Sequence, residues 1–91
     1  MEKSFRQAVH VNDRDNCVTL SEPAKAGDSI RYADSTGASF TVTALSDIPK
    51  WHKAAIRDIP EGGEVIKYGE RIGNALCGIK AGEYLHTHNV K

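Results

Sequence analysis

The sequence carries no excess of charge of either sign. It has 12 Lys plus Arg and 12 Asp plus Glu among 91 residues, so its formal net charge at pH 7 is zero. Proteins that hold nucleic acid or an anionic membrane surface do so through a basic field over part of the molecule. We therefore predict that this chain binds neither nucleic acid nor a membrane, and that it recognises its partners through local contacts.

Long apolar runs are also missing. No stretch approaches the roughly 20 apolar residues that a membrane-spanning helix requires. The opening stretch MEKSFRQAVHV lacks the apolar segment of a secretory signal. The only cysteines are Cys17 and Cys77, and they form no CxxC motif. We therefore expect a cytoplasmic protein in which both cysteines are free, buried thiols.

Helix signals are scarce and strand signals dominate. No segment combines capping residues with a 3.6-residue apolar period over about ten positions. Four segments are instead rich in β-branched and aromatic residues: 5–11, 16–20, 39–45 and 64–68. Residues 51–56 (WHKAAI), after Pro49, are predicted to form a single helical turn. At this length we expect one small all-β domain over residues 1–91.

One local pattern occurs three times. Residues 24–30, 60–66 and 79–85 each contain a small residue, Gly, an acid, any residue and then an aliphatic residue. This order is typical of a tight turn, whose Gly adopts a conformation that a Cβ disfavours, followed by a strand with an inward aliphatic side chain. The unequal spacing of the three copies excludes a solenoid, so the pattern predicts a compact fold built with a recurring turn.

Two histidines lie almost at the end of the sequence, in GEYLHTHNVK. If a strand starts at Glu83, alternation places His86 and His88 on one face together with Tyr84, while Leu85 points into the core. Two imidazoles at this spacing can bind one divalent ion or one anion. The alternative is a pair of solvated or hydrogen-bonded histidines without a ligand.

His52 and Lys53 follow the only tryptophan of the chain. They could present an imidazole and an ammonium group to an anion, or they could belong to an ordinary polar turn. Lys67, next to a Tyr-Gly turn, is expected to be solvated, and His10 is expected to be a hydrogen-bonded strand histidine. Neither a glycine-rich phosphate loop nor a nucleophile with a recognisable base is present. The residues alone thus leave the function open.

An ordered series of short motifs runs through residues 47–91. They are HKA at 52–54, IPEG at 59–62, VIKYG at 65–69, IG at 72–73, IKAGE at 79–83 and HTHN at 86–89. In this order the motifs resemble the SAF domain of the altronate and galactarate dehydratase family. Residues 1–46 resemble it only loosely, through KAGD at 25–28.

The resemblance implies a β-clip fold, a small barrel-like domain with bent hairpins. It also implies a partner, because in fused dehydratases the SAF domain precedes a larger catalytic region, and in sulfolactate sulfo-lyase it forms a separate small subunit. We therefore expect the small subunit of a two-chain sugar-acid dehydratase that turns a 2-hydroxy acid into a 2-keto acid by β-elimination. The alternatives are the small subunit of a sulfolactate sulfo-lyase, which releases sulfite, and a non-catalytic SAF binding module.

The resemblance also assigns roles to five residues. His52, His86 and His88 are expected at the edge of an active site that a large catalytic subunit completes. His86 and His88 would either ligate a divalent metal, Fe²⁺ or Mn²⁺, or transfer protons for the leaving group. Lys53 and Lys67 are expected to bind the small anionic sugar-acid substrate.

Overall fold

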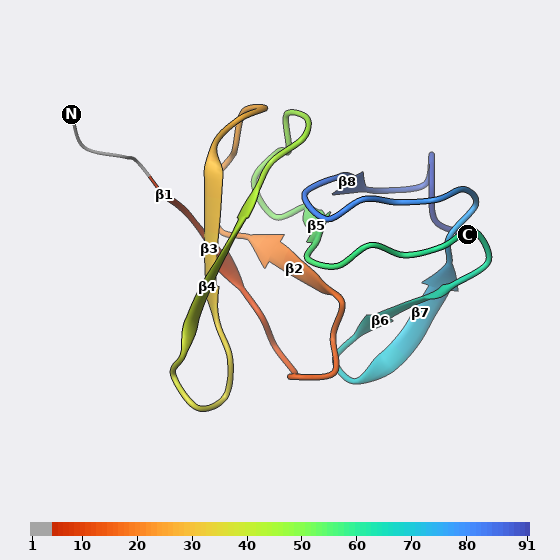
Figure 1. The fold of residues 1–91 in the computed structure, drawn as a ribbon, viewed down its shortest axis with the longest axis horizontal. Coiled ribbons are helices and arrows are strands. Elements are labelled where there is room, and N and C mark those ends of the chain that lie inside the picture. Colours follow the sequence, from red (N-terminus) through yellow and green to blue (C-terminus); the bar gives the residue numbers. More distant parts are fainter. Residues whose placement is uncertain (1–4) are drawn as a thin grey trace.

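The computed structural model describes residues 5–91, and strands are the only regular elements among them (Figure 1). None of the described residues forms a helix long and apolar enough to cross a membrane. The strands are β1 (Phe5–Val9), β2 (Cys17–Leu20), β3 (Ser29–Ala33), β4 (Ser39–Thr43), β5 (Lys53–Ala55), β6 (Glu64–Lys67), β7 (Glu70–Asn74) and β8 (Tyr84–Leu85). The prediction of an all-β fold is confirmed.

Six strands form one curled sheet in the order β4-β3-β1-β2-β5-β8. Its neighbours are antiparallel except for β1 and β3, which run parallel. Strands β6 and β7 form a separate hairpin. In Figure 1 the β3–β4 hairpin stands at one end of the molecule and the β6–β7 hairpin at the other, so β2 and β5 occupy the middle.

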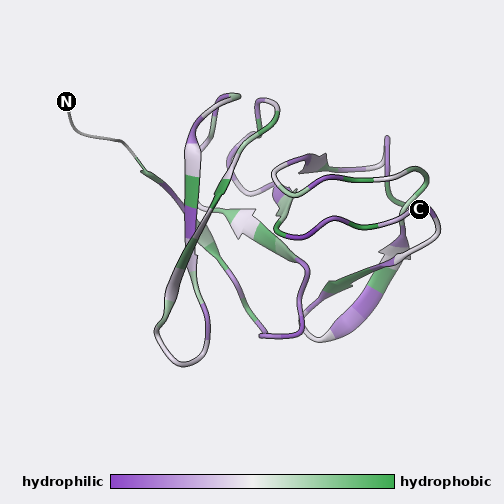
Figure 2. Cartoon of the chain, in the orientation of Figure 1, coloured by the Kyte–Doolittle hydropathy of each residue, from purple (hydrophilic) through white to green (hydrophobic). Residues whose placement is uncertain are grey.

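Two apolar cores lie on opposite faces of β2 and β5. Val18 and Ala54 belong to one buried cluster, whereas Cys17 and Ala55 belong to the other. Successive side chains of a strand point to opposite faces, so these two strands are apolar on both. Figure 2 shows that β2 is apolar, whereas the loop that precedes it is polar.

The recurring Gly-containing turn binds the backbone of a buried alanine in each of its three copies. In each copy the alanine carbonyl accepts from the Gly N–H, and the alanine N–H donates to the carbonyl of the residue after that Gly. The donor–acceptor distances lie between 2.7 and 3.0 Å. The pairs are Gly27–Asp28 with Ala44, Gly62–Gly63 with Ala75, and Gly82–Glu83 with Ala55. In the second copy the turn lies one residue earlier than the sequence pattern predicts, because Gly62 rather than Gly63 has positive φ and Val65 rather than Ile66 is the buried aliphatic residue. In all three copies the turn joins segments that are distant in the sequence.

Gly82 is the most constrained glycine of the three. All three have positive φ, with Gly82 at 97°. A Cβ on Gly27 or Gly62 would meet open space, whereas a Cβ on Gly82 would overlap the carbonyl oxygen of Thr43. The chain that leads into β8 therefore passes directly under the end of β4, and no other residue type fits there.

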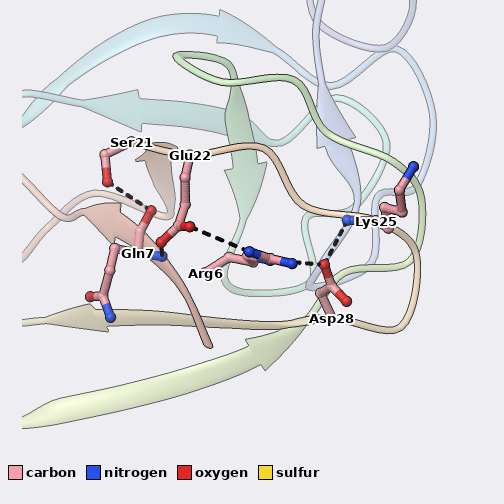
Figure 3. A network of polar contacts seen from close by, with 6 residues as sticks. All are labelled: Arg6, Gln7, Ser21, Glu22, Lys25 and Asp28. Carbon is pink, nitrogen blue, oxygen red and sulfur yellow. Dashed lines mark hydrogen bonds and ion pairs between the residues drawn. The ribbon is translucent and has the colours of Figure 1, made fainter. Parts of the chain in front are cut away.

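The first of these turns is also tied to β1 by a polar network (Figure 3). The Arg6 guanidinium donates to the carboxylates of Glu22 and Asp28, over 3.4 and 3.2 Å. The Lys25 N–H donates to the same Asp28 carboxylate over 2.9 Å. The Lys25 N–H and then the Arg6 side chain lower the pKa of Asp28. An ionised Asp28 thus holds its turn against β1.

Two predictions are wrong. Residues 51–56 form no helical turn, because Trp51 has φ of 69° and residues 53–55 are strand β5, hydrogen-bonded between β2 and β8. Cys77 is exposed, in the turn after β7, rather than buried. Cys17 is buried as expected, and burial raises the pKa of its thiol to about 11.

Candidate functional site

The pairing of β5 with β8 brings the histidines together. In this antiparallel pair Lys53 lies opposite Leu85, and Ala54 lies opposite Tyr84. Continuing the register by one residue places His52 across from His86, and their ring centroids are 5.1 Å apart. His52 and His86, which are 34 positions apart in the sequence, thus meet at one edge of the sheet.

Tyr84 lies at the centre of this group. Its hydroxyl is 2.7 Å from Nδ1 of His52. Its ring stacks on His86 with a centroid distance of 5.7 Å, and it lies 5.5 Å from the ring of His88. We call His52, Tyr84, His86 and His88 the histidine cluster. The structure therefore gathers the three predicted histidines around one tyrosine.

A turn, rather than the predicted continuous strand, brings His86 and His88 to Tyr84. Strand β8 ends at Leu85, which is fully buried as expected. Residues 86–89 form a turn, because the carbonyl of His86 accepts from the N–H groups of Asn89 and Val90 over 3.1 and 3.0 Å. The prediction of a continuous strand beyond Leu85 is wrong, and this turn, rather than strand alternation, places His86 and His88 beside Tyr84.

Asn89 holds this turn, and sequence reasoning missed its role. Its side chain is buried, with 2% exposed. Its Oδ1 accepts from the His86 N–H over 3.0 Å, and its Nδ2 donates to the Tyr84 carbonyl over 2.9 Å. The available signal was the residue type, because Asn often replaces backbone partners in turns. Asn89 is therefore a positioning residue for two of the histidines.

Trp51 positions the third histidine through a β-bulge. The carbonyl of Leu20 accepts from the Trp51 N–H over 2.7 Å, while the Leu20 N–H donates to the His52 carbonyl over 2.9 Å. Trp51 and His52 therefore both lie opposite Leu20, which defines a β-bulge. Trp51 has a left-handed backbone conformation, at a position that is usually Gly in bulges of this type. Bulges of this kind redirect the side chain that follows. The indole of Trp51 itself is 64% exposed.

The two predicted lysines occupy different places. Lys53 is half-buried on β5 and lines a pocket of about 240 Å³ next to His86. Lys67 does not line that pocket. Its ammonium group is 3.3 Å from the hydroxyl of Tyr68 and 4.5 Å from the centroid of the Tyr68 ring. The structure thus places Lys53 beside the histidine cluster and Lys67 at the tip of the β6–β7 hairpin.

The cluster alone does not make a metal centre. Among residues 5–91 no group of three or more His, Cys, Asp or Glu side chains could hold a metal ion. Nδ1 of His52 is already engaged by Tyr84. Imidazole nitrogens suit divalent iron or manganese, so His86 and His88 could supply part of a ligand set, and the remaining ligands would have to come from outside the described residues.

The ring nitrogens of His86 and His88 are the open groups of the cluster. Both residues are exposed, and within residues 5–91 no hydrogen bond engages either ring. Imidazole exchanges protons near neutral pH, and it binds anions when protonated. The arrangement can therefore transfer protons to and from a ligand that lies against this edge of the sheet.

Comparison with known proteins finds relatives of this chain among dehydratases and lyases. Residues 6–91 match the sequence model described as the altronate/galactarate dehydratase SAF domain. Altronate dehydratase of Escherichia coli is 49% identical over 51 residues, which are 56% of this chain and 10% of that enzyme. The (2R)-sulfolactate sulfo-lyase subunit alpha of Paracoccus pantotrophus is 42% identical over 57 residues, which are 63% of this chain and 85% of that subunit.

A third relative aligns along almost the whole chain. Altronate dehydratase of Bacillus subtilis is 33% identical over 89 residues, which are 98% of this chain and 16% of that enzyme. The chain thus spans a small part of the altronate dehydratases and most of the sulfo-lyase subunit. The family match includes the three Gly-containing turns and the whole histidine cluster. By this match, and with the all-β architecture that accompanies it, the chain belongs to the altronate/galactarate dehydratase SAF domain family.

Proposed function

We propose that this chain is the small subunit of a two-chain sugar-acid dehydratase. In this proposal the histidine cluster forms one wall of an active site, and a larger catalytic chain forms the rest. The observation that carries it is the gathering of three imidazoles from two distant segments at an exposed sheet edge, beside a pocket lined by Lys53. Because the histidine cluster is exposed and forms only one wall of the proposed active site, it fits a site that a second chain completes.

The chemistry requires groups of the kind that the cluster offers. Dehydration removes the C2 proton and the C3 hydroxyl of a sugar acid, and the resulting enol tautomerises to a 2-keto acid. The C2 proton is weakly acidic, so positive charge must stabilise the carboxylate as negative charge develops on it. A neutral imidazole would take the C2 proton, and a protonated imidazole would give its proton to the leaving hydroxyl, which departs as water. Lys53 would bind the carboxylate.

A metal role for His86 and His88 is a second form of the same proposal. Divalent iron or manganese would polarise the substrate carboxylate, and these two imidazoles would be part of its ligand set. Lys67 stays a predicted substrate contact, which requires that the substrate or the larger chain reaches the β6–β7 hairpin. Turnover is measured after a chelator removes the metal and again after Fe²⁺ or Mn²⁺ is added back. This comparison separates the metal role from proton transfer.

The sulfo-lyase is the second candidate, because the chain spans 85% of the length of a sulfo-lyase alpha subunit. There the leaving group would be sulfite in place of hydroxide, and the proton abstraction at C2 would be the same. A cytoplasmic location, predicted from the sequence, accompanies both candidates, and cell fractionation tests it. A third possibility, a non-catalytic binding module, leaves the histidines without a role in turnover.

The test is capture of a partner from the native host with a tagged chain, followed by assay on altronate, galactarate and (2R)-sulfolactate with Fe²⁺ or Mn²⁺. We expect a larger chain and formation of a 2-keto acid, with sulfite only if the second candidate holds.

Replacing both His86 and His88 with Ala should lower kcat by about 100-fold or more. His10→Gln, which changes the histidine outside the cluster, should leave kcat unchanged. A chain that elutes alone and inert favours the binding module.

A further inference from the structure

We infer that the pocket next to the histidine cluster is a subsite for the carboxylate end of a small hydroxy acid, with Thr87 and Ile72 as specificity-determining residues. The inference rests on the proposed function and deepens it. The pocket has a volume of about 240 Å³ and is lined by Lys53, Ile72, His86, Thr87 and Val90. These residues come from β5, β7 and the segment after β8. The β6–β7 hairpin thus supplies one wall of a site whose chemistry lies on β5 and β8.

Lys53 supplies a positive charge without a counter-ion. The ion pairs among residues 5–91 both involve Arg6, so none in that range neutralises Lys53. The Cys17 thiol, close enough to feel the charge of Lys53, has its pKa raised to about 11 by burial and stays neutral at pH 7. A half-buried lysine without an ion-pair partner favours binding of an anion. The backbone of Lys53 is held between β2 and β8, so this charge is well positioned.

The other residues that line the pocket indicate which class of anion it can bind. The hydroxyl of Thr87 is exposed and can donate to a carboxylate or accept from a substrate hydroxyl. His86 also lines this pocket, so a group bound to Lys53 would be adjacent to the cluster. Ile72, 44% exposed, and Val90 form an aliphatic wall. The volume is below the roughly 300–1,000 Å³ of pockets for drug-sized ligands, which limits the ligand to a small organic acid.

The experiment is an NMR titration of the ¹⁵N-labelled chain with galactarate, (2R)-sulfolactate, sodium sulfate and the neutral polyol galactitol. We expect the organic acids to shift the amide signals of Lys53, Ile72 and Thr87 with saturation at millimolar concentrations. Galactitol should shift none of them. The inference is overturned if galactarate and sulfolactate shift none of these signals at about 100 mM, which would saturate a site of millimolar Kd, or if sulfate binds equally well, because the pocket would then be a general anion site.

Matched variants assign the residues. Lys53→Met should weaken galactarate binding at least about tenfold, because it removes a charged partner. Lys80→Met removes the same charge from an exposed turn that does not line the pocket, and it should change the affinity less than about twofold. Thr87→Val keeps the shape and should weaken binding several-fold, while Ile72→Trp should block the pocket. Equal effects of Lys53→Met and Lys80→Met would overturn the inference.

The subsite and the proposed function can fail separately. If a captured two-chain enzyme is active but Thr87→Val and Ile72→Trp leave its KM for the acid unchanged, the subsite is wrong and the lyase assignment stands. If the chain binds the acids at this pocket but no preparation forms a 2-keto acid, the subsite stands and the lyase assignment is wrong.

Discussion

Two polar groups of this molecule behave in opposite ways. Asp15 is 1% exposed, and its carboxylate accepts from the N–H groups of Asn12, Tyr68 and Gly69 over 3.2, 3.0 and 2.8 Å. The histidine cluster is partly exposed, and no hydrogen bond within residues 5–91 engages the rings of its last two histidines. Both carboxylate oxygens of Asp15 accept hydrogen bonds from the protein, whereas the ring nitrogens of His86 and His88 stay available.

The difference separates polar groups that the fold itself uses from polar groups that it leaves available for a ligand. Asp15 ties the β1–β2 loop to the two-residue turn of the β6–β7 hairpin, where Tyr68 and Gly69 both have positive φ. Gly tolerates that conformation, but Tyr does not, so the carboxylate stabilises a turn that is otherwise unfavourable. A polar group satisfied in this way has little capacity for a ligand. The histidines are held by other residues and can accept one.

Removing Asp15 should have the largest effect on stability. Asp15→Ala leaves three N–H groups without their charged acceptor, at the turn where Tyr68 is left-handed. We expect the free energy of unfolding to fall by about 3–5 kcal/mol, since each unsatisfied buried group costs about 1–3 kcal/mol. Urea denaturation measures this change. Asp13→Ala, an exposed acid in the same loop, is the control, and a loss below about 1 kcal/mol for Asp15→Ala would contradict the assigned role.

Asn89→Ala should have an intermediate effect that reaches the cluster. It removes the acceptor of the His86 N–H and the donor to the Tyr84 carbonyl. We expect a loss of about 1–3 kcal/mol and altered aromatic ¹H signals of His86 and His88, because the turn that carries them loosens. Asn74→Ala, which removes an exposed side-chain contact on β7, should not alter those signals. Unchanged imidazole signals in Asn89→Ala would show that the turn does not depend on Asn89.

Trp51→Gly should raise stability by about 1 kcal/mol, because Gly adopts the left-handed conformation of the bulge without strain. It should also keep His52 against Tyr84, since the backbone of the bulge is retained. Trp51→Val, in contrast, should lower stability, because β-branched residues tolerate positive φ poorly. Thermal unfolding of the three proteins checks the order. A Trp51→Gly protein less stable than wild type would mean that the exposed indole makes stabilising contacts.

The smallest effect on stability is expected from the cluster itself. The double replacement of His86 and His88 by Ala removes exposed rings, so the free energy of unfolding should change by less than about 0.5 kcal/mol. Turnover of the proposed two-chain enzyme should still fall sharply. If the double variant instead unfolds as readily as Asp15→Ala, the histidines are structural and the contrast between the two groups disappears.

The site was only partly visible in the sequence. His86 and His88 could be found because they lie one residue apart after a recognisable turn, and His52 because it precedes Lys53 after the only tryptophan. The resemblance assigned the three histidines to one site. Asn89 could not be assigned, because a single Asn in a polar tail has many possible partners. Strand β5 was mistaken for a helical turn, because the sequence WHKAAI contains helix-forming alanines and shows no strand alternation. Both of its alanines are buried, one in each core.

Local sequence therefore determined the all-β class, the three Gly-containing turns and most of the strands, but not β5, because alternation, β-branched residues and left-handed glycines act within a few residues of one another. Tertiary structure alone decided which polar residues serve the fold and which remain open. That distinction depends on contacts between distant segments: Asp15 with the turn at Tyr68 and Gly69, His52 with Tyr84, and Lys53 with the pocket beside His86. Residues so far apart in the sequence form no local pattern, because their burial and their hydrogen-bond partners exist only once the sheet has formed.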